Sequence, residues 1–283
     1  MNRGNISRRS EHCREVEAEL VKHVRGRKVR LEGFNNLTKS LSFNIYDICY
    51  ARTPESQLEY LEYIDEEYDS DRLGGIIEEV TRIIDAKLVN ITTQDYDPRG
   101  ASVVALLNED KTILDTIKQG GRGESSIVGH LDKSHITAHT YPEFDTATGL
   151  ATFRVDIDVS TCGTISPLRA LPQLIDSFDS DVVLIDYRVR GFTRDTRGKK
   201  VFIDHDINSI QDFIDEEVLS DYLVYDINIL SDNIFLTKMR KKNIRLKDYL
   251  FGPDEEELEP EERKRIKELL RSEMQEIFEC ENF

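Results

Sequence analysis

The stretch His130-Leu-Asp-Lys-Ser-His-Ile-Thr-Ala-His-Thr-Tyr-Pro-Glu143 holds half of the six histidines of this 283-residue chain. Its short apolar alternation predicts a β-strand. Ser134 is a nucleophile candidate, because possible bases or orienting groups lie within a few residues: His130, Asp132, His135 and His139. Regular alternation puts Ser134 and His139 on opposite faces, so contact between them needs a bulge or a bend. Taken alone, the stretch also fits polar residues on the wet face of an edge strand.

The pattern around this stretch predicts an α+β fold. Ala151 to Ser160 alternates strictly, as in a half-buried strand of an antiparallel sheet. Further strands are expected at 29–33, 87–93, 101–107, 182–192 and 222–230, and helices from Pro54, at 73–85, from Ser166 as N-cap, and within 253–283. Strands and helices do not alternate one for one. An antiparallel β-sheet packed with helices therefore fits better than a parallel doubly wound sheet.

Composition narrows the classes of partner. The net charge of -17 and the pI near 4.9 argue against nucleic acid or an anionic membrane, since both favour a basic surface. No apolar run approaches the length of a membrane span, and the N-terminus lacks the apolar core of a secretion signal, so a cytoplasmic location is expected. Residues 1–28 form a polar extension, and the globular pattern covers 29–283.

The cysteines predict neither a zinc site nor a disulfide framework. Cys13, Cys49, Cys162 and Cys280 are far apart and form no CxxC pair. Cys162 differs from the others because a glycine follows it directly after an expected strand.

Several motifs resemble one family. The run from His130 to Glu143 and the later Ser160-Thr-Cys-Gly163 are similar to the self-cleaving site of bacterial S-adenosylmethionine decarboxylases, of the magnesium-requiring, enterobacterial-like subclass. The similarity extends over Gly33 to Ser42, Asp186 to Thr193 and Ile203 to Ser209. It thus spans nearly the whole chain from about Arg30 onward, and implies the α/β sandwich of that family.

The resemblance implies an enzyme that makes its own cofactor. The Ser134 hydroxyl would attack the Lys133 carbonyl, and cleavage would give a β chain, 1–133, and an α chain, 134–283, that begins with a pyruvoyl group. That ketone would form a Schiff base with S-adenosylmethionine and act as the electron sink for decarboxylation, which gives the aminopropyl donor for spermidine synthesis. His139 matches the histidine that aids processing. Cys162 matches the cysteine that returns a proton to Cα, a role that a protonated thiol can fill.

The family's substrate contacts map onto two further positions. Tyr96 matches an aromatic residue that stacks on the adenine, and an aromatic face suits both a purine and a sulfonium cation. Glu143 matches the acid that holds the ribose hydroxyls, because its two acceptor oxygens suit a diol. Ser102 matches a serine that assists processing, although Ser126 also stands shortly before Ser134.

Other interpretations stay open at this level. The chain could decarboxylate arginine or ornithine on the same fold, although Tyr96 and Glu143 argue against it, or it could be an uncleaved regulatory homologue. Relatives are dimers or dimers of dimers, so a homo-oligomer is expected. The resemblance implies magnesium as an activator, and no ligand cluster in the sequence is assigned to it. Arg188, Arg190 and Asp204 are either ion pairs or substrate contacts, and His205 is expected to be a surface or packing residue.

Overall fold

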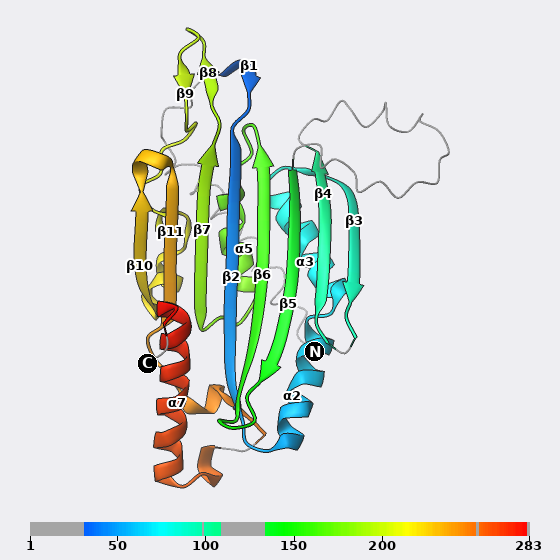
Figure 1. Cartoon of the computed structure of the whole chain (residues 1–283), viewed down its shortest axis with the longest axis vertical. Helices are drawn as coiled ribbons and strands as arrows, with labels where there is room; N and C mark the ends of the chain where they lie inside the picture. The colour runs from blue at the N-terminus through cyan, green and yellow to red at the C-terminus, as the bar shows by residue number, and fades with distance from the viewer. Residues whose placement is uncertain (1–30, 98, 109–133, 253–254, 282–283) are drawn as a thin grey trace, which may run out of the picture.

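One large antiparallel sheet organises the molecule (Figure 1). The computed structural model describes residues 31–97, 99–108, 134–252 and 255–281. The strand order is β10-β11-β7-β2-β6-β5-β4-β3, and the short β12 pairs parallel to β2. These strands are β2 (Thr38–Ala51), β3 (Lys87–Asp95), β4 (Ala101–Asn108), β5 (Ser134–Phe144), β6 (Leu150–Cys162), β7 (Val182–Arg190), β10 (Tyr222–Ile229), β11 (Ile234–Lys241) and β12 (Leu250–Phe251). A separate small sheet joins β1 (Leu31–Asn35), β8 (Thr193–Asp195) and β9 (Lys200–Val201).

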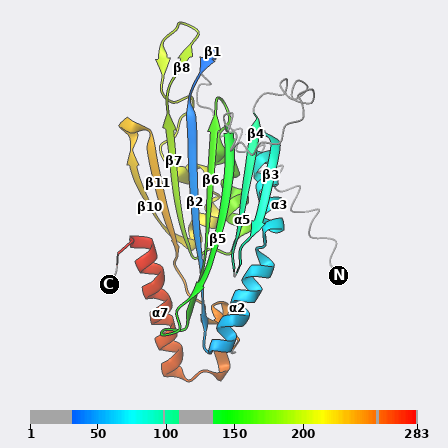
Figure 2. The ribbon, with the colours of Figure 1, turned by 45° about the vertical axis from the view of Figure 1, so that its right-hand side comes forward.

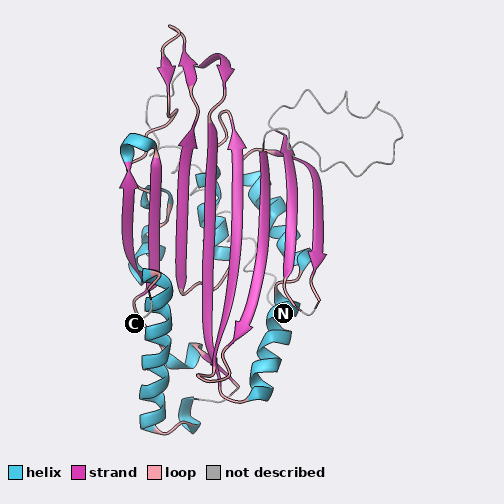
Figure 3. Cartoon of the chain, in the orientation of Figure 1, coloured by secondary structure: helices cyan, strands magenta, loops and turns pink. Residues whose placement is uncertain are grey.

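Helices cover one face of the large sheet. They are α2 (Pro54–Glu67), α3 (Ser70–Ile83), α5 (Leu171–Ser177) and the short α6 (Glu216–Asp221), with 3-10 turns at Pro167–Ala170, Ile210–Phe213, Leu230–Asp232, Leu246–Asp248 and Glu255–Glu257. Alternate strand residues such as Phe43 and Ile157 pack against helix residues such as Ile77 in the main core. We call this the helix face, and Figure 3 shows the cyan helices behind the magenta sheet.

The opposite face, which we call the outer face, is only partly covered. α7 (Pro260–Glu279) packs across its lower end, where Ile266, Leu270 and Met274 meet Ile48 and Val182 in a second core. Figure 2 shows α7 and α2 on opposite sides of this end of the sheet. The apolar stripe of α7 therefore packs on the chain's own sheet.

Local signals explain where the helices begin. Thr53 forms a capping box with Ser56 before Pro54, which starts α2 where the sequence predicts it. The Asp69 side chain accepts a 2.8 Å hydrogen bond from the Arg72 backbone, so α3 begins at Ser70, three residues before the predicted start.

The antiparallel α+β prediction is confirmed, and one local prediction is wrong. Ser166 makes no side-chain capping bond, and the segment after it is a 3-10 turn followed by α5. Pro172 explains the break, because a proline inside a helix removes one hydrogen bond and clashes with the carbonyl four residues earlier. The polar extension 1–28 and the segment from 109 to Lys133 lie outside the described residues.

Candidate active site

Ser134 is the first residue of β5 and is buried on the helix face, with 1% of its surface exposed. Its Oγ accepts a hydrogen bond from the backbone N–H of Cys162, at 3.3 Å. Because β5 and β6 are antiparallel neighbours, the start of β5 meets the end of β6. The sheet thus joins the predicted nucleophile to the predicted proton donor.

Cys162 ends β6 in a turn that is attached to β2. Gly163 has a left-handed φ of 68°, and its N–H donates to the Leu37 carbonyl at 3.1 Å. The Cys162 Sγ lies 4.0 Å from the Thr38 Oγ1, within reach of a weak sulfur hydrogen bond. The Cys162 backbone is therefore held beside a buried serine, while its half-buried side chain lies with Thr38 on the outer face, at an end of the sheet that Figure 1 shows at the top. We call these residues (Ser134, Cys162, Gly163, Thr38) the Ser134 cluster.

His139 lies on the outer face, directly opposite Ser102 on β4 and Asp156 on β6. Ser102 is buried, whereas the histidine is half-buried. The His139 ring stacks near Tyr141 with centroids 6.4 Å apart, and Asp156 is engaged by Arg154 through a 2.8 Å bond from Nε. The predicted processing histidine and the predicted processing serine are therefore cross-strand neighbours.

Tyr96 and Glu143, the predicted substrate-binding residues, lie toward the C-terminal end of β5, away from Ser134. Tyr96 precedes a tight turn closed by its N–H, which donates to the Gly100 carbonyl at 2.7 Å. Gly100 has a φ of 93°, and a Cβ there would lie 2.8 Å from the Thr140 carbonyl oxygen, so only glycine fits. The Tyr96 side chain is 38% exposed. We call Ser102, His139, Tyr96 and Glu143 the His139 cluster.

Glu143 is exposed and lies opposite Thr152 on β6. Partial burial of its carboxyl raises the pKa of Glu143, and a hydrogen bond with the Thr152 side chain opposes that shift. The group thus protonates more readily than an ordinary glutamate, while its oxygens stay accessible to a ligand.

The two clusters are separated along β5. Pairing of β5 with both neighbours runs without a register shift, so Ser134 and His139 lie on opposite faces, as alternation requires. Five residues of extended strand place their Cα atoms roughly 17 Å apart. The structure therefore brings Ser134 to the Cys162 backbone and His139 to Ser102, but brings neither His139 nor Glu143 to Ser134. Lys133 and Ser126 lie outside the described residues.

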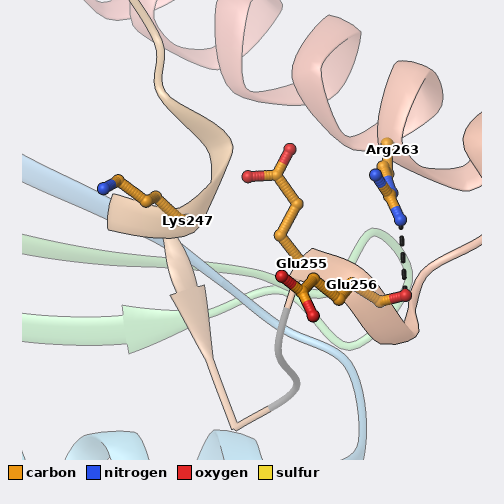
Figure 4. Close-up of a pocket in the computed structure, with 4 residues that line it drawn as sticks. All are labelled: Lys247, Glu255, Glu256 and Arg263. Atoms are coloured by element: carbon orange, nitrogen blue, oxygen red, sulfur yellow. Dashed lines mark hydrogen bonds between the residues drawn. The ribbon is translucent and has the colours of Figure 1, made fainter.

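The described cavities do not coincide with either cluster. One of about 510 Å³, lined by Lys247, Glu255, Glu256 and Arg263 beside α7, lies at the end of the sheet remote from Ser134 (Figures 1 and 4). A second of about 400 Å³ is lined in part by His205 and Phe235. Within the described ranges, no group of three or more His, Cys, Asp or Glu side chains is placed to hold a metal ion. In the same part of the chain, no helix is long and apolar enough to cross a membrane.

Serine and cysteine are side chains that enzymes use as nucleophiles, and here the Ser134 Oγ lies 3.3 Å from the Cys162 backbone nitrogen. A family model described as S-adenosylmethionine decarboxylase matches residues 60–191. The S-adenosylmethionine decarboxylase proenzyme of Clostridium botulinum (strain Eklund 17B / Type B) is 56% identical, over 90% of this chain and 97% of the relative. That of Alkaliphilus metalliredigens (strain QYMF) is 55% identical, over 89% and 95%.

The chain belongs to the S-adenosylmethionine decarboxylase family, whose members are pyruvoyl-dependent. The crystal structure of the adenosylmethionine decarboxylase from Aquifex aeolicus VF5 overlaps 62% of this chain and all of that chain, with 17% identity and a TM-score of 0.30. An overlap at that level carries no conclusion, and the fold rests on the strands and helices described above.

Sequence reasoning missed the contribution of β2. It identified Gly33 to Ser42 as part of the resemblance but gave Thr38 and Lys39 no role. The sequence did contain a signal for Lys39. It is two residues from both Leu37 and Leu41, so in a strand its side chain lies on the same buried face as theirs. Its partner, Asp204, lies 165 residues away and has no local signal.

Proposed function

We propose that the chain is a self-processing, pyruvoyl-dependent decarboxylase of S-adenosylmethionine. The observation that carries the proposal is the adjacency of a buried Ser134 Oγ and the Cys162 backbone, at 3.3 Å. Close relatives named as S-adenosylmethionine decarboxylase proenzymes support both the substrate and the cleavage. Self-cleavage between Lys133 and Ser134 would give chains 1–133 and 134–283.

The residues around Ser134 fit a cofactor made from that serine. Ser134 is enclosed and hydrogen-bonded rather than exposed, so a carbonyl formed there would be shielded from water. A pyruvoyl group supplies the electron sink for the pair of electrons left when carbon dioxide departs. Cys162 holds the proton that is returned to the substrate Cα. Thr38 keeps the thiol at the end of β6 that faces Ser134.

His139 acts in processing as the base for the Ser134 Cα proton, with Ser102 beside it. Because roughly 17 Å of strand separates His139 from Ser134, this step requires the first residues of β5 to leave the sheet. The N-to-O acyl shift that precedes this step favours such a movement, since it frees the Ser134 nitrogen and leaves residue 133 attached only through the side-chain ester.

Tyr96 and Glu143 bind the adenosyl end of the substrate. Nine residues of extended strand place the Cα atoms of Glu143 and Ser134 roughly 30 Å apart, so binding of one substrate at both places also requires β5 to leave this arrangement. The exposed Tyr96 ring offers a face to the adenine or the sulfonium cation, and Glu143 accepts hydrogen bonds from the ribose hydroxyls. Magnesium remains a proposed activator only. The described residues offer it no ligand cluster, so no step is assigned to it.

We also propose that cleaved protomers form a homo-oligomer through the outer face of β10. Leu223, Tyr225, Ile227 and Ile229 alternate along this edge strand, and each is between 36% and 57% exposed. Within the described residues β10 is the edge strand of the sheet, and an apolar stripe on its face suits packing against the same stripe of a second copy about a two-fold axis. Ile227→Lys should lower the mass measured by light scattering to that of a single protomer. Leu58→Lys, at an exposed leucine of α2, should leave it unchanged.

The intact mass of the purified protein under denaturing, reducing conditions tests the proposal. Two fragments that meet at Lys133/Ser134, the C-terminal one lighter than a serine-initiated peptide by one ammonia, support it. Release of carbon dioxide from S-adenosylmethionine then establishes the activity. A single full-length chain with no decarboxylation after prolonged incubation would overturn the assignment.

A further inference from the structure

A fully buried lysine lies beside the Ser134 cluster. Lys39 is in β2, on the helix face, with 1% of its side chain exposed. Its Nζ donates to Asp204 Oδ2 at 2.8 Å and to the Gly163 carbonyl at 3.1 Å. A charge taken out of water is costly unless it is paired, so this ammonium group is held by a specific arrangement.

Asp204 belongs to a chain of contacts that fixes the lysine from behind. Its second oxygen, Oδ1, lies 2.8 Å from His205 Nδ1, and His205 Nε2 lies 3.2 Å from the Tyr187 hydroxyl. Burial by itself raises the pKa of Asp204, but the His205 hydrogen bond and the Lys39 charge outweigh it and hold that pKa below its ordinary value. The carboxylate is therefore ionised at neutral pH and pairs with Lys39.

Leu37 and the first two residues of β2 contact Cys162, the last residue of β6, and Gly163, which follows it. The Leu37 carbonyl accepts from the Gly163 N–H, Thr38 Oγ1 lies beside the Cys162 sulfur, and Lys39 Nζ binds the Gly163 carbonyl. Both backbone polar groups of Gly163 are thus engaged by the segment Leu37 to Lys39. The Thr38 hydroxyl, 4.0 Å from the sulfur, restricts rotation of the Cys162 side chain.

We propose that Lys39 and Thr38 are positioning residues that aim the Cys162 thiol at the substrate carbon to be protonated. Lys39, braced by Asp204, sets the turn at Gly163, and Thr38 sets the direction of the sulfur. This inference rests on the proposed function, because it assumes that Cys162 delivers the proton. It also gives Asp204 and His205 a role in supporting the lysine.

The position at which the proton is added can be measured separately from the rate of the reaction. After loss of carbon dioxide, the electron pair is shared between the substrate Cα and the carbon that was the Ser134-derived ketone. A proton on Cα, followed by hydrolysis, returns the ketone. A proton on the other carbon, followed by hydrolysis, leaves the substrate nitrogen on the α chain as a terminal alanine and releases an aldehyde. That chain gains about 1 Da relative to the pyruvoyl form.

Thr38→Val tests the inference in the full-length protein. We expect complete cleavage and a substrate KM within a factor of about two, but a kcat lowered about ten- to hundredfold, because misplacing a reacting group by 1 Å costs that much. We also expect the alanine-terminated α chain to accumulate during turnover. Thr38→Ser should restore much of both. Thr92→Val, at an exposed threonine on β3, is the matched control and should behave as the wild type.

Lys39→Met tests the proposed role of Lys39 in setting the turn at Gly163. Because this substitution leaves the Asp204 carboxylate buried without its cation, it is compared with a double variant. Lys39→Met/Asp204→Asn removes both charges and should recover the melting temperature. If the pair only stabilises the fold, kcat and the α-chain mass recover with it. If Lys39 positions the turn, as proposed, the kcat defect and the alanine-terminated chain persist in the stable double variant.

The controls separate this inference from the function beneath it. A wild-type protein that neither cleaves nor decarboxylates overturns both. A wild-type protein that does both, with Thr38→Val and the double variant matching it in kcat and in α-chain mass, overturns only the positioning role.

Discussion

The two ends of β5 differ in the way that they hold reactive groups. In the Ser134 cluster, a buried hydroxyl accepts a hydrogen bond from the backbone N–H of Cys162, and the half-buried thiol of that residue lies beside the Thr38 hydroxyl. In the His139 cluster, the imidazole stands on the open face of the sheet, among a cross-strand serine and charged side chains. The first arrangement favours delivery of a proton away from water. The second favours a base and substrate-binding residues that are accessible from solvent.

The two clusters lie on one uninterrupted strand, β5. Bringing a residue of one cluster to the other therefore requires part of that strand to leave the sheet. The proposed processing step needs His139 at Ser134, whereas the sheet pairing keeps them on opposite faces. Opening the first residues of β5 breaks pairs with β4 and β6, and each lost hydrogen bond costs about 1 kcal/mol. Slow self-cleavage followed by faster turnover is the expected outcome.

The largest expected effect comes from Ser134→Ala. Removing the hydroxyl removes the nucleophile, so no fragments should form at any incubation time and decarboxylation should be absent. Ser102→Ala, at the opposite cluster, should slow fragment formation without abolishing it, because it changes a helper group. Mass spectrometry over time measures both. Equal loss in the two variants would contradict the division between the clusters.

His139→Ala comes next. The loss of a general base should slow cleavage by about 10²- to 10⁴-fold, and added imidazole should restore part of the rate because the site is half-exposed. His135→Gln is the control on the same strand and face, where burial lowers the pKa of the native histidine so that it is neutral at pH 7. A His139 variant that cleaves at the wild-type rate would assign the base to a residue outside the His139 cluster.

Cys162→Ala tests the role of the Ser134 cluster in decarboxylation. The precursor should still cleave, while kcat for decarboxylation should fall by about 10²- to 10⁴-fold, since a positioned acid has been removed. Cys280→Ala removes an exposed thiol and should leave kcat unchanged. If Cys162→Ala stops cleavage as well, the Ser134 cluster serves both steps and the roles of the two ends are not separate.

Sequence patterns predicted the features of this arrangement that depend on local alternation, but not those that depend on contacts between distant segments. Strict alternation gave β6 and the opposite facing of Ser134 and His139, because side-chain direction in a strand is a local property. The pairing of Lys39 with Asp204 depends on two segments 165 residues apart, and the cross-strand match of Ser102 with His139 depends on register. Neither is encoded in local periodicity. β11 was not predicted either, because both of its faces carry a mixture of polar and apolar side chains and so show no clear alternation.

Gly100→Ala tests how the His139 cluster is built. A Cβ at a φ of 93° and 2.8 Å from the Thr140 carbonyl should lower the free energy of unfolding by about 1–3 kcal/mol. It should also raise the KM, because the turn carries Tyr96. Gly75→Ala, in α3 with open space around it, should instead stabilise the protein by about 0.5–1 kcal/mol. Denaturant unfolding of both variants provides the measurement, and a neutral Gly100→Ala would mean that this turn is not rigid.

Glu143 gives the smallest effect and the most specific one. Burial raises the pKa of its carboxyl, so the ionised form that accepts ribose hydroxyls is lost at a higher pH than for an ordinary glutamate. The KM should therefore rise as the pH falls through that raised pKa. Glu143→Gln should raise the KM about tenfold at pH 8 and should remove this limb of the pH profile.

The stability of the same variant must move with the opposite sign. Because the folded-state pKa of Glu143 is raised, its contribution to stability is present below the unfolded pKa and is lost as the pH rises through the folded value. Glu143→Gln should thus be at least as stable as the wild type at neutral pH while it binds substrate less well. Asp145→Asn is the neighbouring control, since backbone hydrogen bonding lowers the pKa of that exposed carboxyl. A KM profile that changes equally in both variants would place the ribose contact outside the His139 cluster.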